Sequence, residues 1–145
     1  MAEGKVVAVC MSDKKGVPKK NVGQAFLEVG KGLVGDAHAG FAHRQVSMLA
    51  LEDIEKMKEK LSDLEPGSFA ENLTVTGVDL ENVTIGARFR VGKTLLALTQ
   101  IGKECHTKCA IYHKTGDCIM PAKGLFFEVI EGGRVAVGDK VQRLD

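Results

Sequence analysis

The chain has 145 residues, the size of one ordinary domain, and its 20 basic and 19 acidic residues give a formal net charge of +1. A domain of roughly 150 residues can bury about 68–70% of its unfolded surface, so its core needs no disulfide or metal. The balanced charge excludes a global basic field of the kind that attracts nucleic acid or anionic membranes. We therefore expect one domain over residues 1–145, with no nucleic-acid or membrane partner.

The start of the chain indicates a cytoplasmic protein. It shows no long apolar segment followed by a cleavage site, and no later stretch approaches the roughly 18 apolar residues of a membrane helix. In a reducing cytosol the four cysteines are expected to be thiols, metal ligands or catalytic groups rather than disulfides.

Short Val-, Thr-, Ile- and Phe-rich segments separated by glycines predict a mainly β domain. Residues 5–10 form the first predicted strand, with Cys10 as a core thiol, and the lysine-rich residues 12–20 are expected to be an exposed loop. One amphipathic helix is predicted over residues 51–61. Further strands are predicted over residues 22–29, 46–49, 73–76, 83–86, 87–91, 94–101, 125–130, 134–137 and 140–144.

Two details refine this pattern. Apolar and polar residues alternate over residues 73–76, as a half-buried strand requires. The sequence LVGD at residues 33–36 is echoed by AVGD at residues 136–139, which predicts recurring turns rather than a solenoid repeat. Short strands at this spacing favour a barrel or a sandwich.

The most chemically dense stretch is residues 99–118, which holds three of the four cysteines and two of the four histidines. It overlaps the end of a predicted buried strand and continues as a loop, and loops on rigid scaffolds often carry function. Cys105 lies among Lys103, His106 and Lys108, and nearby cations lower the pKa of a thiol. Such a thiolate can ligate a thiophilic metal such as molybdenum or hold a terminal sulfur as a persulfide.

A second dense loop, residues 36–45, contains His38, His43 and Arg44 among small residues. The two histidines are five positions apart, a spacing that suits a metal only in a helix or a tight turn, and the glycine argues against a helix. We expect a hydrogen-bonding loop here rather than a zinc site.

Five ordered segments together resemble the MOSC domain family, which is named for the C-terminal domain of molybdenum cofactor sulfurase. The segments are GDAHAG at residues 35–40, HRQVSML at residues 43–49, GSFAENL at residues 67–73, IGKEC at residues 101–105 and GGRVAVGD at residues 132–139. The resemblance runs over nearly the whole chain. It implies a MOSC-type β-barrel, and the sequence adds one or two short helices.

The resemblance also implies a site built around one cysteine, proposed in the family to carry sulfur or to ligate molybdenum in the pterin cofactor (molybdopterin). By motif position this is Cys105. The polar site residues that the motifs carry over are Asp36, His38, Arg44, Glu71 and Asn72. Arg44 and Lys103 are the candidates for anionic parts of the cofactor, because arginine and lysine bind phosphate.

This sequence departs from larger family members in two ways. It is expected to be a short, free-standing form without the pyridoxal-phosphate-dependent sulfurase domain, which argues against independent sulfur abstraction from free cysteine. It also carries additional thiols at Cys109 and Cys118, which could resolve a disulfide with Cys105.

The functional alternatives remain open at this point. As an enzyme, the protein would transfer sulfur to the molybdenum cofactor or reduce N-hydroxylated compounds. As a carrier, it would deliver the cofactor to biosynthetic or molybdoenzyme partner proteins. An alternative hypothesis is a small β-barrel with a structural zinc site in the loop from Cys105 to Cys118 and a non-enzymatic interaction role. The cysteine spacing argues against it, because zinc sites usually show two tight cysteine pairs.

Overall fold

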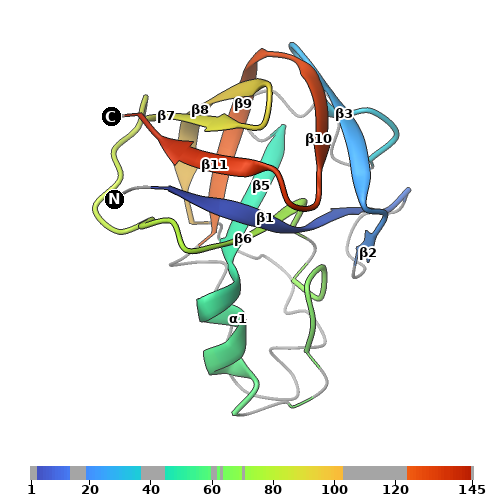
Figure 1. Ribbon diagram of the computed structural model, residues 1–145, viewed down its shortest axis with the longest axis vertical. Helices are drawn as coiled ribbons and strands as arrows, with labels where there is room; N and C mark the ends of the chain where they lie inside the picture. The colour runs from blue at the N-terminus through green and yellow to red at the C-terminus, as the bar shows by residue number, and fades with distance from the viewer. Residues whose placement is uncertain are drawn as a thin grey trace.

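The computed structural model describes residues 3–13, 19–36, 45–59, 62, 64–69, 71–102 and 124–144. The described chain is mainly β, with one short helix, as the sequence predicts (Figure 1). In chain order the elements are β1 Glu3–Met11, β2 Lys20–Asn21, β3 Gln24–Glu28, β4 Gly32–Leu33, β5 Val46–Ala50, α1 Leu51–Met57, β6 Leu73–Thr76, β7 Arg88–Val91, β8 Thr94–Ile101, β9 Leu125–Glu131, β10 Gly133–Ala136 and β11 Lys140–Arg143.

Within these ranges a 7-strand barrel runs in the order β11-β7-β8-β9-β5-β6-β1 and closes through the pairing of β11 with β1. Glu3 lies opposite Gln142 in that closing pair, and β1 and β11 lie side by side in Figure 1. β5 and β6 are parallel, and each other neighbouring pair in the ring is antiparallel. Closure leaves no free edge on the ring itself.

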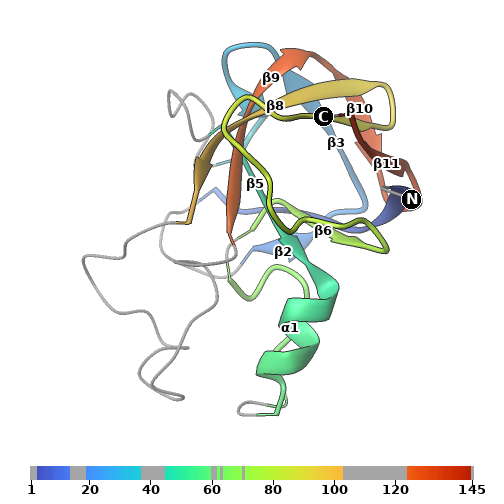
Figure 2. The ribbon, with the colours of Figure 1, turned by 90° about the vertical axis from the view of Figure 1, so that its left-hand side faces the viewer.

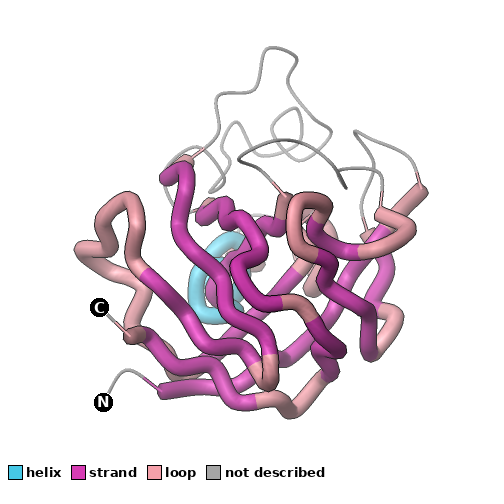
Figure 3. The backbone as a smooth tube through the Cα atoms, turned by 90° about the horizontal axis from the view of Figure 1, so that it is seen from above, coloured by secondary structure: helices cyan, strands magenta, loops and turns pink. Residues whose placement is uncertain are grey.

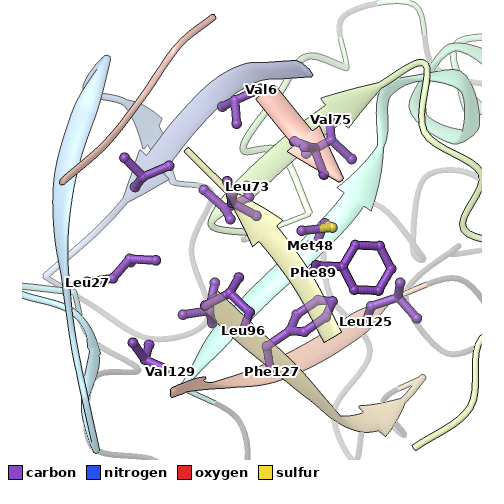
Figure 4. Packing of buried hydrophobic residues seen from close by; sticks show 14 of the residues in the cluster. Val6, Leu27, Met48, Leu73, Val75, Phe89, Leu96, Leu125, Phe127 and Val129 are labelled. Carbon is purple, nitrogen blue, oxygen red and sulfur yellow. The ribbon is translucent and has the colours of Figure 1, made fainter. Parts of the chain in front are cut away.

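A second sheet of three strands, in the order β10-β3-β4, packs beside the barrel. The main core consists mostly of residues from the barrel strands, such as Phe127 of β9, and the small sheet adds Leu27 of β3 and Val135 of β10. Figure 4 shows the side chains from different strands converging on this core. The rings of Phe89 and Phe127 meet edge to face at 5.4 Å between centroids.

Helix α1 follows β5 directly and lies at one end of the barrel, as Figures 1 and 2 show; Figure 3 views the strands from the opposite end. Its buried residues Ile54 and Met57 pack with Leu49, Phe69 and Phe126 in a smaller cluster of their own. The apolar face of α1, which the sequence predicts, therefore covers this end of the barrel. No helix among the described residues has the length and apolar character needed to cross a membrane.

The echoed sequences form matching turns. The amide of Asp36 donates to the carbonyl of Leu33 at 3.1 Å, and the amide of Asp139 donates to the carbonyl of Ala136 at 3.1 Å. The glycine before each aspartate has φ of 91° and 94°, the left-handed region that glycine adopts without steric cost. The prediction of recurring turns is confirmed.

Two local predictions need correction, and the helix predicted over residues 51–61 is shorter, because α1 ends at Met57. Residues 83–86 form no strand, because a turn closes from the amide of Ala87 to the carbonyl of Thr84 at 3.0 Å and Gly86 has φ of 95°. The exposed loop predicted over residues 12–20 includes Lys19, which is only 4% exposed. The short strands β2 and β4 were not predicted, because two residues are too few to show a period.

Candidate functional site

The structure describes three of the residues that the sequence singled out, Asp36, Glu71 and Asn72. Each of them is buried, with 6%, 0% and 1% of its surface exposed. Cys105, Lys103, Arg44 and His38 lie outside the described residues, as do Cys109 and Cys118.

The structure describes the residues on either side of residues 103–123, the stretch that contains Cys105. Strands β8 and β9 run antiparallel, with Ile101 opposite Leu125, and the amide of Gly102 donates to the carbonyl of Gly124 at 2.7 Å. Gly102 and Gly124, which flank residues 103–123 in the sequence, therefore lie side by side. Cys105 follows Gly102, the first residue of this fixed base, by three positions.

A small cleft of about 140 Å³ lies next to this base, between α1, the loop after β6 and the ends of β8 and β9. Its lining includes Asp53, Glu81, Asn82, Ile101 and Leu125. Pockets for drug-sized ligands measure about 300–1,000 Å³. The cleft is thus smaller than such a pocket.

Asp36 forms a buried ion pair. Its Oδ1 lies 2.7 Å from Nζ of Lys19, and both side chains are 0% exposed. The same oxygen accepts a hydrogen bond from the amide of Ser12 at 3.0 Å. The carboxylate is therefore neutralised within the protein, at the residue that immediately precedes residues 37–44.

The far side of residues 37–44 is also fixed. The backbone amide of Gln45 donates to the carbonyl of Phe127 at 3.1 Å. The side-chain Oε1 of Gln45 accepts from the backbone amide of Val129 at 3.0 Å. Gly32 packs against the backbone of Gln45 so closely that a Cβ at Gly32 would lie 2.2 Å from the carbonyl oxygen. The segment that carries His38 and Arg44 thus starts and ends at buried, hydrogen-bonded residues.

Glu71 organises the loop before β6. Its Oε2 accepts from the amide of Gly67 at 2.8 Å and from Oγ1 of Thr74 at 2.7 Å, while Oε1 accepts from the amide of Phe69 at 3.2 Å. Burial raises the pKa of Glu71, and these hydrogen bonds oppose the rise only in part. The Glu71 carboxylate therefore accepts hydrogen bonds from its own loop and from the strand that follows it.

Asn72 joins two strands on either side of β6. Its Oδ1 accepts from the amide of Ser47 at 3.0 Å, and its Nδ2 donates to the carbonyl of Cys10 at 3.1 Å. Ser47 belongs to β5 and Cys10 to β1. Asn72 therefore holds the entrance of β6 in register with both neighbours.

Cys10 is a core thiol, as the sequence predicts, and it is 0% exposed. Burial first, then the nearby Glu71 carboxylate, raises the pKa of the thiol to about 12, although Lys19 acts in the opposite direction. Only the thiolate is nucleophilic. Cys10 is therefore chemically inert near neutral pH and is not a second reactive cysteine.

The sequence patterns did not predict the burial of two polar residues at this site, Lys19 and Thr74. Lys19 lies in a lysine-rich stretch that read as exposed, and no local pattern distinguishes it from its neighbours. The alternating pattern predicts Thr74 on the exposed face of a half-buried strand. Thr74 is instead 0% exposed, and its hydroxyl donates to the carboxylate of Glu71. The alternation over residues 73–76 is real, but both faces of β6 are covered at this end.

The described residues supply a rigid frame rather than a set of ligands. No group of three or more His, Cys, Asp or Glu side chains within the described ranges could hold a metal ion. Asp36, Glu71 and Asn72 all have protein partners at hydrogen-bond distance. The other candidate residues from the sequence, Cys105, Arg44, Lys103 and His38, lie outside the described residues.

Comparison with known proteins gives a consistent result. The model of the MOSC domain matches residues 35–142. Among curated proteins, an uncharacterised Bacillus subtilis protein, YflK, is 29% identical over 140 residues, a stretch that covers 89% of this chain and 63% of YflK. The chain thus spans less than two thirds of that relative's length.

Solved structures share the fold. The YuaD protein from Bacillus subtilis superposes with a TM-score of 0.80 at 18% identity, over 96% of this chain and 94% of YuaD. YiiM from Escherichia coli superposes with a TM-score of 0.69 at 19% identity, over 99% of this chain and 70% of YiiM. At these identities the likeness establishes the barrel architecture and nothing finer.

Proposed function

Because the chain belongs to the MOSC domain family, whose model matches residues 35–142, we propose that it binds the molybdenum cofactor or a precursor of it through Cys105. The Cys105 thiolate ligates molybdenum or carries a terminal sulfur as a persulfide. Partner proteins of cofactor biosynthesis, or molybdoenzymes, are the proposed donors and acceptors.

The observation that carries this proposal is the placement of the family match on the described frame. The match contains the loops of Asp36 and Glu71 and the strand that leads to Cys105. The two loops meet in one buried network, because Lys19 contacts Asp36 through its side chain and Gly67 of the Glu71 loop through its backbone. Such support from a surrounding shell is what a precise binding site needs.

Each residue has a defined task in this proposal. Arg44 and Lys103 bind the anionic part of the ligand, for which guanidinium and ammonium groups are suited. Asp36, Glu71 and Asn72 stabilise the barrel end through their own contacts, and His38 contributes a polar contact to the ligand. When bound, the cofactor supplies a thiophilic metal centre. The task of Cys105 is to present a thiolate to it, a form that Lys103 favours by its charge.

The test is to purify the protein anaerobically from a molybdenum-replete host and to measure molybdenum, zinc and released pterin by elemental analysis and fluorescence. The wild type is expected to hold molybdenum and pterin in equal amounts, and Cys105→Ser is expected to lose both. Cys10→Ala is the matched control, since Cys10 is buried away from solvent, and it should retain both. Zinc without pterin would contradict the proposal and support the structural zinc site instead.

A further inference from the structure

The outer face of the small sheet carries large apolar side chains that are exposed to solvent. Phe26 of β3 is 61% exposed, Val29 is 59% exposed and Val34 is 50% exposed. An antiparallel sheet that packs one face on the core usually presents polar residues on its other face. The inner face of β3 is already buried, because Leu27 points into the core (Figure 4). The small sheet therefore has apolar residues on both of its faces.

The exposed residues line an open groove of about 750 Å³, together with Gly132 and Gly133. The groove is bare backbone at Gly132, since a Cβ there would lie 2.5 Å from the carbonyl oxygen of Leu27. Val34 is held beside Phe26, because its amide donates to the carbonyl of Phe26 at 2.9 Å. Exposed apolar residues that gather in one patch, unlike single ones, mark a site of interaction.

Two opposite charges flank Phe26 on the same face. Arg134 of β10 lies directly opposite Phe26 in the pairing of β10 with β3, and opposite residues share a face of the sheet. Glu28 follows Phe26 by two positions along β3, so it shares that face as well. Both charged residues are exposed. We call Phe26, Val29, Val34, Glu28 and Arg134 together the Phe26 patch.

Both charges are available to a second molecule. Glu28 has Lys31 as an ion-pair partner, but Oε2 and Nζ are 3.9 Å apart and the two side chains are 52% and 62% exposed. Exposed pairs of this kind contribute little to stability. The Arg134 side chain has no ion pair or hydrogen bond with any residue that the structure describes.

The arrangement of these charges is complementary to itself. From the regular spacing of residues and strands, Glu28 lies about 7 Å from Phe26 along the strand, and Arg134 lies about 5 Å from it across the sheet. A two-fold axis through Phe26 that runs diagonally between these two directions exchanges them. It places Phe26 against its own copy, and Glu28 against Arg134 of the second copy at two symmetric positions. The β3 strands of the two copies then cross steeply, as in orthogonally packed sheets.

We propose that the Phe26 patch is the contact surface of a homodimer, with Phe26 at its centre and Glu28 paired with Arg134 of the second copy. A partner with a strongly charged surface would face one of these two charges with its own sign, whereas a second copy satisfies both. Standard interfaces use about 20–30 residues a side, and the patch is smaller. The dimer is therefore weak and depends on concentration. This inference is independent of the proposed cofactor function.

Sedimentation velocity of the full chain tests the dimer, with a reductant present so that no disulfide links two molecules. The protein concentration is varied from about 1 μM to about 1 mM, the range of Kd that suits a small interface. The sedimentation coefficient is expected to rise from that of a monomer towards that of a dimer. A wild type that stays monomeric at the highest concentration would overturn the proposal.

Charge reversal tests the predicted pairing. Glu28→Arg alone and Arg134→Glu alone each place like charges at both symmetric contacts, so each variant should dimerise at least about tenfold more weakly than wild type. An equimolar mixture of the two variants places opposite charges at both contacts and should form a mixed dimer with about the wild-type Kd. A mixture that dimerises no better than either variant alone would overturn the pairing.

Phe26→Ser is the second probe, because it removes the apolar centre at an exposed position and should raise the Kd at least about tenfold. The matched control is Glu3→Arg. Glu3 is 45% exposed and pairs with Lys140, and this end of β1 lies on the opposite side of the molecule from β3 in Figure 1. The control should dimerise like wild type, and circular dichroism checks that every variant is folded. A dimer that persists unchanged in Phe26→Ser and in both charge variants would use another face and overturn the proposal.

Discussion

Asn72 and Ser47 exchange hydrogen bonds where β5 and β6 run side by side. The amide of Ser47 donates to Oδ1 of Asn72 at 3.0 Å, and the amide of Asn72 lies 3.0 Å from Oγ of Ser47 and donates to it. Asn72 also contacts Cys10 on the opposite neighbour through Nδ2. One side chain thus ties three strands together at the end of the barrel where the candidate site loops attach.

Replacing Asn72 by alanine should therefore destabilise the whole barrel. The change leaves the buried amide of Ser47 and the carbonyl of Cys10 without their partner, at a cost of about 1–3 kcal/mol for each unsatisfied group. We expect the free energy of unfolding in urea to fall by about 3 kcal/mol. Ser47→Ala removes only Oγ, and the amide of Asn72 keeps the carbonyl of Ser47 at 3.1 Å as its acceptor, so this variant should lose less. An equal loss in the two variants would contradict this assignment of the contacts.

Gly67 offers a test of backbone contact against backbone strain. Gly67 and Gly86 have nearly the same φ, 94° and 95°, but a Cβ at Gly67 would meet the carbonyl of Lys19 at 2.1 Å, while one at Gly86 would meet nothing within 4 Å. Gly86→Ala should cost about 1–2 kcal/mol from the left-handed conformation alone. Gly67→Ala should lower the thermal midpoint much further, and equal shifts would show that the contact with Lys19 is unimportant.

Glu71 should make the protein less stable as the pH rises. Its folded pKa lies above the ordinary value of 4.5 because of burial. A raised pKa contributes stability that is fully present below the unfolded value and is lost as the pH rises through the folded value. The advantage of wild type over Glu71→Gln in urea unfolding should therefore shrink from about pH 4.5 upward. An advantage that grows with pH would contradict this sign.

Glu52 should show the opposite dependence. Burial acts to raise the pKa of this carboxylate, but hydrogen bonds from the amide of Gly77 and the hydroxyl of Thr76 outweigh it, so the pKa lies below 4.5. Both donors contact Oε2 at 3.1 Å. The advantage of wild type over Glu52→Gln should be present above pH 4.5 and disappear as the pH falls through the lowered value. A flat difference between pH 3 and pH 7 would show that these contacts are absent in solution.

The sequence predicted the fold because most strands carry a local signal. Residues 94–101 are a long apolar run, and β8 has the same bounds. The prediction failed at residues 83–86, where a β-branched run looked like a strand although a turn and Gly86 with φ of 95° end it. Long-range contacts beside this segment also override local propensity, because the Arg143 guanidinium donates to the carbonyls of Asp79, Glu81 and Asn82.

The candidate site was predicted only in part, for a physical reason. Motifs identified Asp36 and Glu71, but a motif does not say whether a carboxylate faces a ligand or a buried partner. Lys19 is separated from Asp36 by 17 positions, and nothing in its own neighbourhood predicts a buried ion pair. Partners that the fold brings together from distant positions are visible only in three dimensions.

The proposed function depends on Cys105, and the pKa of its thiol tests that function most directly. Intact protein is alkylated with iodoacetamide across pH 5–10, and the rate at each of the four cysteines is read from its peptide by mass spectrometry. We expect Cys105 to react with a half-maximal pH below about 8.5, the value of a free cysteine, and Cys10, with a pKa of about 12, to stay unmodified in the folded protein. A Cys105 that reacts no faster than an ordinary free thiol, or is protected like Cys10, would contradict its assignment as the sulfur-bearing or molybdenum-ligating group.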